Sequence, residues 1–167
     1  MTLTGLARLN EADAQEARAL LLACAAVPRW AEEILQCRPY ADLETALTAA
    51  RTAARPWSEE EVDAALARHP RIGERPQGAD ADAAHSRREQ AAVDGVDPEV
   101  ARRLREGNAA YEERFGHVFL IRAAGRSAAE ILAALEERLT HDPATERRIA
   151  AEQLREIAVL RLEKELA

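Results

Sequence analysis

The sequence contains few residues of the kind that form covalent or metal-bound frameworks, with only two cysteines and four histidines among its 167 residues. Cys24 and Cys37 lack the C-x-x-C spacing of zinc sites and redox motifs, and one pair of thiols does not make a disulfide framework. Both occur in apolar helical patterns, so we expect them to lie reduced in the core. This cysteine usage argues against a disulfide-stabilised secreted fold and favours a reducing compartment.

The sequence also lacks an excess of basic residues and any long apolar run. Its formal net charge of −7 opposes binding to nucleic acid or to an anionic membrane surface, because both need a concentrated basic face. No stretch approaches the roughly 18 to 20 apolar residues of a membrane span, and the N-terminus has no basic region followed by an apolar run. We therefore expect a cytoplasmic protein without nucleic-acid or membrane partners.

Apolar residues at helical spacing are, by contrast, abundant. Hydrophobic residues make up 47% of the sequence and charged residues 32%, which argues against disorder and suits a single domain, residues 1–167, with a sizeable core. The prolines fall between the apolar-periodic segments and not inside them. The pattern predicts an all-α, single-domain bundle of about seven to nine helices.

Capping residues and prolines indicate where these helices begin and end. Two points stay open: Gly107-Asn108 could interrupt a helix, and residues 118–121 form either a buried helical turn or an extended segment. The predicted helices are one capped by Asn10 with an apolar stripe from Ala14 to Cys24, one from Pro28 closed by Pro39, one from Asp42 to about Arg55, one opened by a Ser58-x-x-Glu61 capping box and ended by His69-Pro70, one around 82–93, one from Asp97-Pro98 towards Phe115, one from a Ser127-x-x-Glu130 capping box to about Leu139, and one from Asp142-Pro143 onwards.

His69 is the strongest candidate for acid/base chemistry, because it stands at a predicted helix end fixed by Pro70. Imidazole titrates near neutral pH, so a fixed histidine can deliver or remove a proton, and the carbonyl dipoles of a helix end favour its cation. A His-Pro pair also ends helices without any chemistry. The pair by itself leaves both interpretations open.

Ser86 and Glu89 form a second group, three positions apart and therefore on one face of a helix. A hydroxyl that donates to a carbonyl and a carboxylate that accepts from N–H groups can together hold a ureido or amide group. The same spacing is that of a capping box, which remains the structural alternative. His85 lies beside them, but no H-E-x-x-H arrangement or third spaced ligand accompanies it, so we expect no metal.

Residues 119–125 and Arg161 complete the candidate groups. The small residues at the end of this segment allow a planar ligand to approach its main-chain N–H and C=O groups, although such apolar runs are also ordinary core. The guanidinium of Arg161 is suited to a substrate carboxylate, and its alternative is a surface pair with Glu165.

The order and spacing of these segments resemble the 2-oxo-4-hydroxy-4-carboxy-5-ureidoimidazoline (OHCU) decarboxylases of urate breakdown. The resemblance spans nearly the whole chain. Arg71 and Glu74 differ from the form that many eukaryotic members have. The segments that carry it are Asn10-Glu11-Ala12, Pro28-Arg29-Trp30, His69-Pro70-Arg71-Ile72-Gly73-Glu74, Ser86-x-x-Glu89-Gln90, residues 111–115, the Phe119-Leu120-Ile121-x-Ala123-x-Gly125-Arg126-Ser127 segment, and residues 156–162.

The resemblance implies an all-helical, cofactor-free enzyme, commonly a homodimer, that removes carbon dioxide from OHCU and yields (S)-allantoin. Urate oxidase and hydroxyisourate hydrolase would precede it. OHCU also decays uncatalysed to racemic allantoin, so one-handed product is the sign of the enzyme. The resemblance places the catalytic proton donor at His69 and the substrate-orienting carboxylate at Glu89. The other substrate-binding residues that it implies are Pro70, Ser86, Arg87, Arg88, Gln90, Ile121, Arg122, Ala123, Ala124, Gly125 and Arg161.

Two alternatives remain beside this interpretation. One is a hydrolase of a related ureido or cyclic amide compound, in which Glu89 activates water. The other is a non-enzymatic helical interaction module, in which the same segments are only helix caps and stops.

Overall fold

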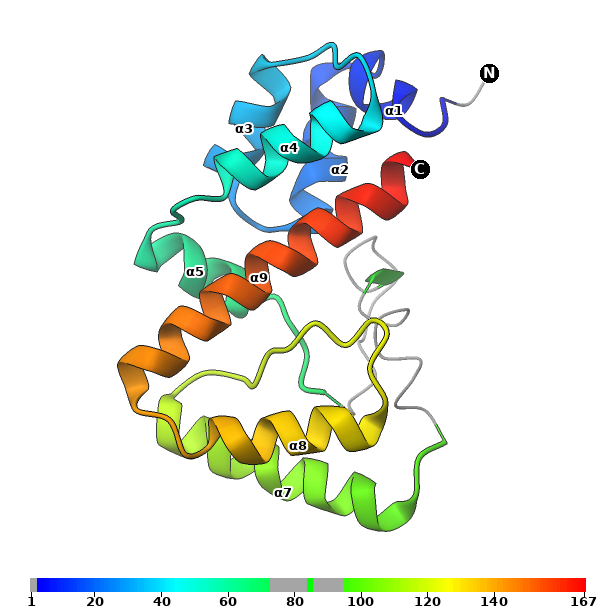
Figure 1. The fold of residues 1–167 in the computed structure, drawn as a ribbon. Coiled ribbons are helices and arrows are strands. Elements are labelled where there is room, and N and C mark those ends of the chain that lie inside the picture. Colours follow the sequence, from blue (N-terminus) through cyan, green and yellow to red (C-terminus); the bar gives the residue numbers. More distant parts are fainter. Residues whose placement is uncertain (1–2, 73–83, 86–94) are drawn as a thin grey trace. The chain divides into compact units, whose positions relative to one another are not determined.

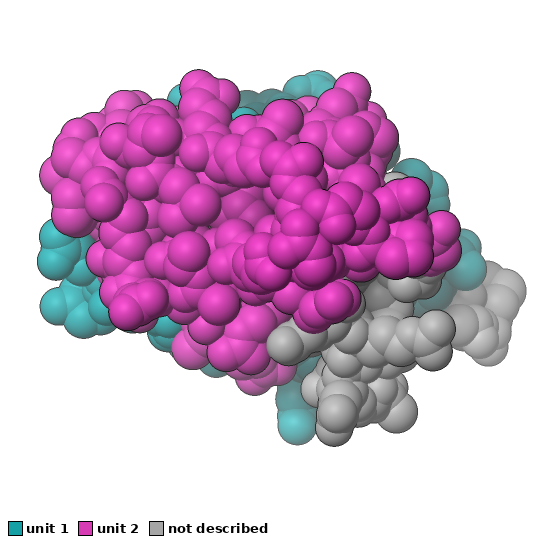
Figure 2. Space-filling model, turned by 90° about the horizontal axis from the view of Figure 1, so that it is seen from below, with its two compact units in different colours: residues 1–65, 155–167 teal, residues 66–154 magenta. Residues whose placement is uncertain are grey.

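The computed structural model describes residues 3–72, 84–85 and 95–167. These residues form eight helices and no strand, which confirms the all-α prediction. Figure 1 shows the helices in order along the chain. The chain divides into two compact units, residues 1–65 with 155–167 and residues 66–154 (Figure 2). The single domain stays a prediction. Within the described part of the chain, no helix combines the length and the apolar character that crossing a membrane requires.

The first unit is built around a buried tryptophan. Trp30 is 0% exposed, its indole N–H donates to the carbonyl of Ala50 at 2.9 Å, and Trp57 packs edge-on against it with ring centroids 6.3 Å apart. The helices of this unit are α1 (Ala7–Asn10), α2 (Ala14–Cys24), α3 (Pro28–Gln36), α4 (Leu43–Ala53), α5 (Glu59–Leu66), whose last residue belongs to the second unit, and the C-terminal half of α9 (Pro143–Leu166).

The start of the chain differs from the prediction. Asp13, and not Asn10, caps α2, because its carboxylate accepts from the Glu16 N–H at 2.9 Å. Asn10 instead ends α1, and its amide exchanges hydrogen bonds of 2.8 and 2.9 Å with the backbone of Tyr40. A helix of four residues is too short to show an apolar period in the sequence, so α1 was missed.

The two cysteines also differ from each other. Both are free thiols, but Cys24 is buried whereas Cys37 is exposed. The expectation of two core cysteines is therefore wrong for Cys37. It is the residue after the last turn of α3, where the apolar face of the helix no longer continues.

A group of charged hydrogen bonds connects α3 to the start of α5 within the first unit. The guanidinium of Arg29 donates to both carboxylate oxygens of Glu61, at 2.8 and 3.0 Å. Glu61 also accepts from the Ser58 N–H at 2.8 Å, which completes the predicted capping box. The hydrogen bond from Arg29 holds the pKa of Glu61 below its usual value of 4.5.

Replacing Glu61 with glutamine is expected to weaken the dependence of the free energy of unfolding on pH in the acid range. A carboxylate whose pKa is lowered by folding stabilises the fold above its unfolded pKa, and this contribution disappears as the pH falls through the lowered value. The free energy of unfolding, measured with urea from about pH 7 to about pH 3, should therefore fall more steeply in the wild type than in the variant. Glu60→Gln, on the next residue, is the control, and identical profiles for wild type and Glu61→Gln would contradict the prediction.

The second unit contains α7 (Pro98–Phe115), α8 (Ala128–Arg138) and the N-terminal half of α9. Helices α7 and α8 lie side by side (Figure 1). A Cβ atom at Gly107 would stand 2.6 Å from a methyl carbon of Leu135, so the absence of a side chain allows α8 to approach. Gly107-Asn108 does not interrupt α7. The core of this unit consists of Ile72, Leu104, Tyr111, Phe119, Ile121, Ala123, Ile131, Leu132 and Leu135.

Most of the other predicted boundaries are confirmed. Asp42 caps α4, Ser127 and Glu130 form a complete capping box at α8, and prolines open α3, α7 and α9. The predicted helix around 82–93 lies almost entirely outside the described residues. Residues 118–121, which the sequence left open, form no helix and continue without regular secondary structure to the turn before α8.

Candidate active site

His69 lies three residues after Leu66, the last residue of α5, so the helix ends slightly before the His-Pro pair that was expected to stop it. Its backbone N–H donates to the Leu66 carbonyl at 3.1 Å, one turn back. His69 and Pro70 are both half-buried, and Ile72 is 6% exposed in the core of the second unit. The imidazole is thus attached to a backbone that is fixed at both ends while remaining partly accessible.

Helix α7 holds the residues that follow Pro70. The side-chain amide of Asn108, which is 3% exposed, donates to the Ile72 carbonyl at 2.9 Å. One turn further on, the Glu112 carboxylate accepts from Nε and Nη2 of Arg71 at 2.5 and 2.9 Å. Two consecutive residues of the His69 segment, Arg71 through its side chain and Ile72 through its backbone, are therefore bonded to two consecutive turns of one helix.

The segment before α8, residues 118–126, is held from two sides. Nη1 of Arg138 donates to the Leu120 carbonyl at 2.5 Å, and the side-chain oxygen of Gln153 accepts from the Arg122 N–H at 2.8 Å. Arg126 closes the turn through hydrogen bonds to the Ala123 and Arg122 carbonyls, at 3.1 and 3.0 Å. The Arg122 N–H is committed to Gln153, so a ligand of residues 121–125 has to use the other backbone groups of the segment.

A buried ion pair lies behind this segment. Arg138 and Glu146 are 6% and 0% exposed, and Nε of Arg138 donates to Glu146 at 2.6 Å. Glu146 also accepts from the Tyr111 hydroxyl at 2.5 Å and lies 3.2 Å from the ring of His141. Burial, together with the bond to Glu146, raises the pKa of Tyr111 far above its usual value. The phenol consequently remains a proton donor, and the network holds the guanidinium that binds Leu120.

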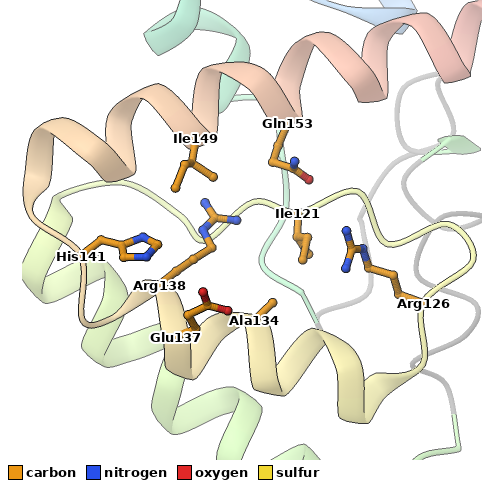
Figure 3. A pocket seen from close by; sticks show the side chains of 8 residues that line it. All are labelled: Ile121, Arg126, Ala134, Glu137, Arg138, His141, Ile149 and Gln153. Carbon is orange, nitrogen blue, oxygen red and sulfur yellow. The ribbon is translucent and has the colours of Figure 1, made fainter.

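A cavity of about 220 Å³, which Arg138 also lines, opens between α8 and the N-terminal half of α9 (Figure 3). Of the predicted site residues that the structure describes, only Ile121 lines it. Two of its polar side chains, Arg138 and Gln153, already hold the backbone of the segment before α8. The cavity is lined by Ile121, Arg126, Ala134, Glu137, Arg138, His141, Ile149 and Gln153.

The second predicted group cannot be placed in this geometry. Ser86, Arg87, Arg88, Glu89 and Gln90 lie outside the described residues, as do Gly73 and Glu74 of the first motif. His85, directly before them, is 1% exposed. Among the residues that the structure describes, no three His, Cys, Asp or Glu side chains gather into a group that could hold a metal ion.

Arg161 is 2% exposed, so it does not lie on the surface, where the alternative of a pair with Glu165 placed it. Glu165 is bonded to Arg8 near the start of the chain. Arg161 belongs to the first unit, whereas His69, Pro70 and residues 121–125 share the second.

Sequence reasoning missed the side chains that hold these segments. Asn108 carried a usable signal, since it falls four residues after Leu104 and three before Tyr111, on the buried stripe of α7. A polar residue on an apolar stripe indicates a specific hydrogen bond, because burying an unbonded amide is unfavourable. No comparable signal in the sequence marked Glu112, Arg138 or Gln153, because charged and amide residues are ordinary on helix surfaces.

Comparisons with known proteins agree with this architecture. The sequence model of the OHCU decarboxylase family matches residues 10–163. The chain is similar to a 2-oxo-4-hydroxy-4-carboxy-5-ureidoimidazoline decarboxylase of Haloferax volcanii, with 31% identity over 81% of this chain and 79% of the relative. A protein of the same name from Amia calva is 41% identical over 57% of this chain and 55% of its own.

The fold is also similar to solved structures of proteins that carry related names. A crystal structure of OHCU decarboxylase in the presence of (S)-allantoin superposes with a TM-score of 0.73 over 89% of this chain and 97% of that one, at 26% identity. An (S)-allantoin synthase matches with a TM-score of 0.70 over 98% of this chain and 54% of its own, at 19% identity, and shows the fold alone. With the family match extending over nearly its whole length, the chain belongs to the OHCU decarboxylase family.

Proposed function

We infer that this chain is a carboxy-lyase that decarboxylates OHCU to allantoin. The observation that carries this conclusion is the family match over residues 10–163, supported by the relative that is 31% identical over 81% of the chain. The likeness to an OHCU decarboxylase structure obtained with (S)-allantoin supports the (S) product.

The chemistry that we propose needs no cofactor, because the substrate contains its own electron acceptor. The bond between the ring carbon and its carboxylate breaks and carbon dioxide leaves. The electron pair forms a C=C bond to the ring carbon that bears the ureido group, and the imine pair is displaced onto the ring nitrogen and the carbonyl oxygen conjugated with it, so that the nitrogen takes up a proton. The hydroxyl on the decarboxylated carbon then loses its proton and becomes the ring carbonyl of allantoin, while the ureido-bearing carbon receives a proton on one face. A positioned general acid that supplies this proton decides which enantiomer forms.

In this proposal His69 supplies the proton and Glu89 accepts hydrogen bonds from the ureido or ring N–H groups. Pro70, Ser86, Arg87, Arg88 and Gln90 shape the pocket, and residues 121–125 offer backbone donors to the developing negative charge on oxygen. Arg161 binds the substrate carboxylate. The half-buried position of His69 at the end of α5 supports its part in this assignment.

We further propose a cytoplasmic homodimer that receives OHCU from a hydrolase acting on the product of urate oxidase. The absence of C-x-x-C spacing and the two free thiols agree with a reducing compartment.

The test uses OHCU freshly generated from urate by the two upstream enzymes. With this protein present, circular dichroism should develop the signal of (S)-allantoin faster than the uncatalysed reaction consumes OHCU, and carbon dioxide should be released in equal amount. Slow, racemic product at the rate of the no-protein control would refute the proposal. Accelerated loss of OHCU without carbon dioxide release would indicate the hydrolase instead.

A further inference from the structure

We infer that Asn108 and Glu112 are positioning residues that hold His69 in the orientation for one-sided protonation. The inference rests on the proposed function and extends it to two side chains that do not belong to the predicted substrate pocket. Both lie on α7, one turn apart, and both bond to the segment that carries His69.

Asn108 is the first of these two positioning residues. Its amide is 3% exposed and lies on the buried stripe of α7, where packing alone favours an apolar side chain. Its N–H group donates to the Ile72 carbonyl at 2.9 Å, whereas its Oδ1 has no hydrogen-bond partner among the described residues. The bond to this backbone segment therefore compensates only the N–H side of the buried amide. Asn108 therefore determines the path of the chain three residues after His69.

Glu112 is the second positioning residue. It receives two N–H groups of the Arg71 guanidinium, at 2.5 and 2.9 Å, in the fork geometry that restricts orientation as well as distance. The side chains of Arg71 and Glu112 are 48% and 23% exposed. Surface ion pairs contribute to the fold mainly where their geometry is bidentate, as it is here, and this pair restricts the direction of the chain two residues after His69.

The two contacts act on His69 through a short and stiff connection. Pro70 restricts its own backbone rotation and the conformations of the residue before it, and on the other side the His69 N–H is bonded to the Leu66 carbonyl. Displacing the acid by about 1 Å can lower a rate by about 100-fold. Loss of either contact is thus expected to affect proton delivery more than substrate binding.

The experiment compares Asn108→Ala, Glu112→Ala and Glu112→Gln with the wild type. Both alanine variants should lower kcat by roughly tenfold or more while KM changes by less than roughly twofold. The enantiomeric excess of allantoin, extrapolated to high enzyme concentration so that uncatalysed decay is negligible, should fall as well. Glu112→Gln retains one acceptor for Arg71 and should recover part of both values.

Glu106→Gln is the matched control, because Glu106 lies on the same helix and forms an exposed ion pair with Arg102. It should leave kcat and enantiomeric excess at wild-type values. If the alanine variants lower the melting temperature while kcat and enantiomeric excess stay unchanged, Asn108 and Glu112 have only a structural role and the inference is wrong. Should Asn108→Ala not fold, the two Glu112 variants decide.

A second readout separates this inference from the proposed function. The NMR resonances of the His69 ring should shift in Asn108→Ala and Glu112→Ala and stay in place in Glu106→Gln. If the wild type forms no (S)-allantoin, the proposed function is wrong. If the His69 resonances do not shift in the alanine variants, Asn108 and Glu112 do not position His69, whatever the activity of the variants.

Discussion

His69→Asn is expected to give racemic allantoin and to lower kcat by at least about 100-fold, since asparagine can hydrogen bond but cannot deliver a proton at neutral pH. The change removes the proposed acid while keeping a polar side chain of similar reach at the end of α5. Bond cleavage needs no acid, so slow carbon dioxide release should persist at a rate approaching the uncatalysed one. Circular dichroism reports the handedness, and trapped carbon dioxide reports the turnover.

The matched control is His117→Asn, which removes another half-buried imidazole from the second unit without touching the proposed pocket. This variant should retain both the rate and the enantiomeric excess. An unchanged excess in folded His69→Asn would exclude His69 as the proton donor and direct attention to the other side chains of the pocket.

Glu146→Ala is expected to cause the largest loss of stability, about 3–5 kcal/mol in the free energy of unfolding. The change leaves the Arg138 guanidinium, 6% exposed, without its carboxylate, and deprives the Tyr111 hydroxyl of its acceptor. Equilibrium unfolding in urea measures the effect. Because Arg138 also binds the Leu120 carbonyl, the segment that leads into residues 121–125 should loosen, and KM for OHCU should rise.

Two further variants test whether the burial of the charged pair causes the loss of stability in Glu146→Ala. Glu152→Gln lies on the same helix but breaks an exposed pair with Arg148, so its effect should stay within about 0.5 kcal/mol. The double variant Arg138→Met with Glu146→Leu removes both charges and should regain part of the stability that Glu146→Ala loses. A loss below about 1 kcal/mol in Glu146→Ala would mean that the pair is not buried in solution.

The helical architecture was predictable because its signals are local. Apolar spacing identified α2 to α5 and α7 to α9, and capping boxes at Ser58 and Ser127 marked two helix starts within a residue. The failures were also local. Asn10 is a good capping residue but lies in a four-residue helix, and Cys37 follows an apolar stripe that ends one turn earlier.

By itself, the sequence determined most of the helices and most of their boundaries, the family and the position of His69 after a helix end. Each of these depends on residues that are close together in the chain or on an ordered set of short motifs. The tertiary structure alone decided what holds the candidate site: the contacts of Asn108 with Ile72, Glu112 with Arg71, Arg138 with Leu120 and Gln153 with Arg122. These bonds join residues 18 to 41 positions apart. The reason is physical, because a single hydrogen bond between distant residues leaves no periodic pattern in the chain and forms only where folding brings donor and acceptor together.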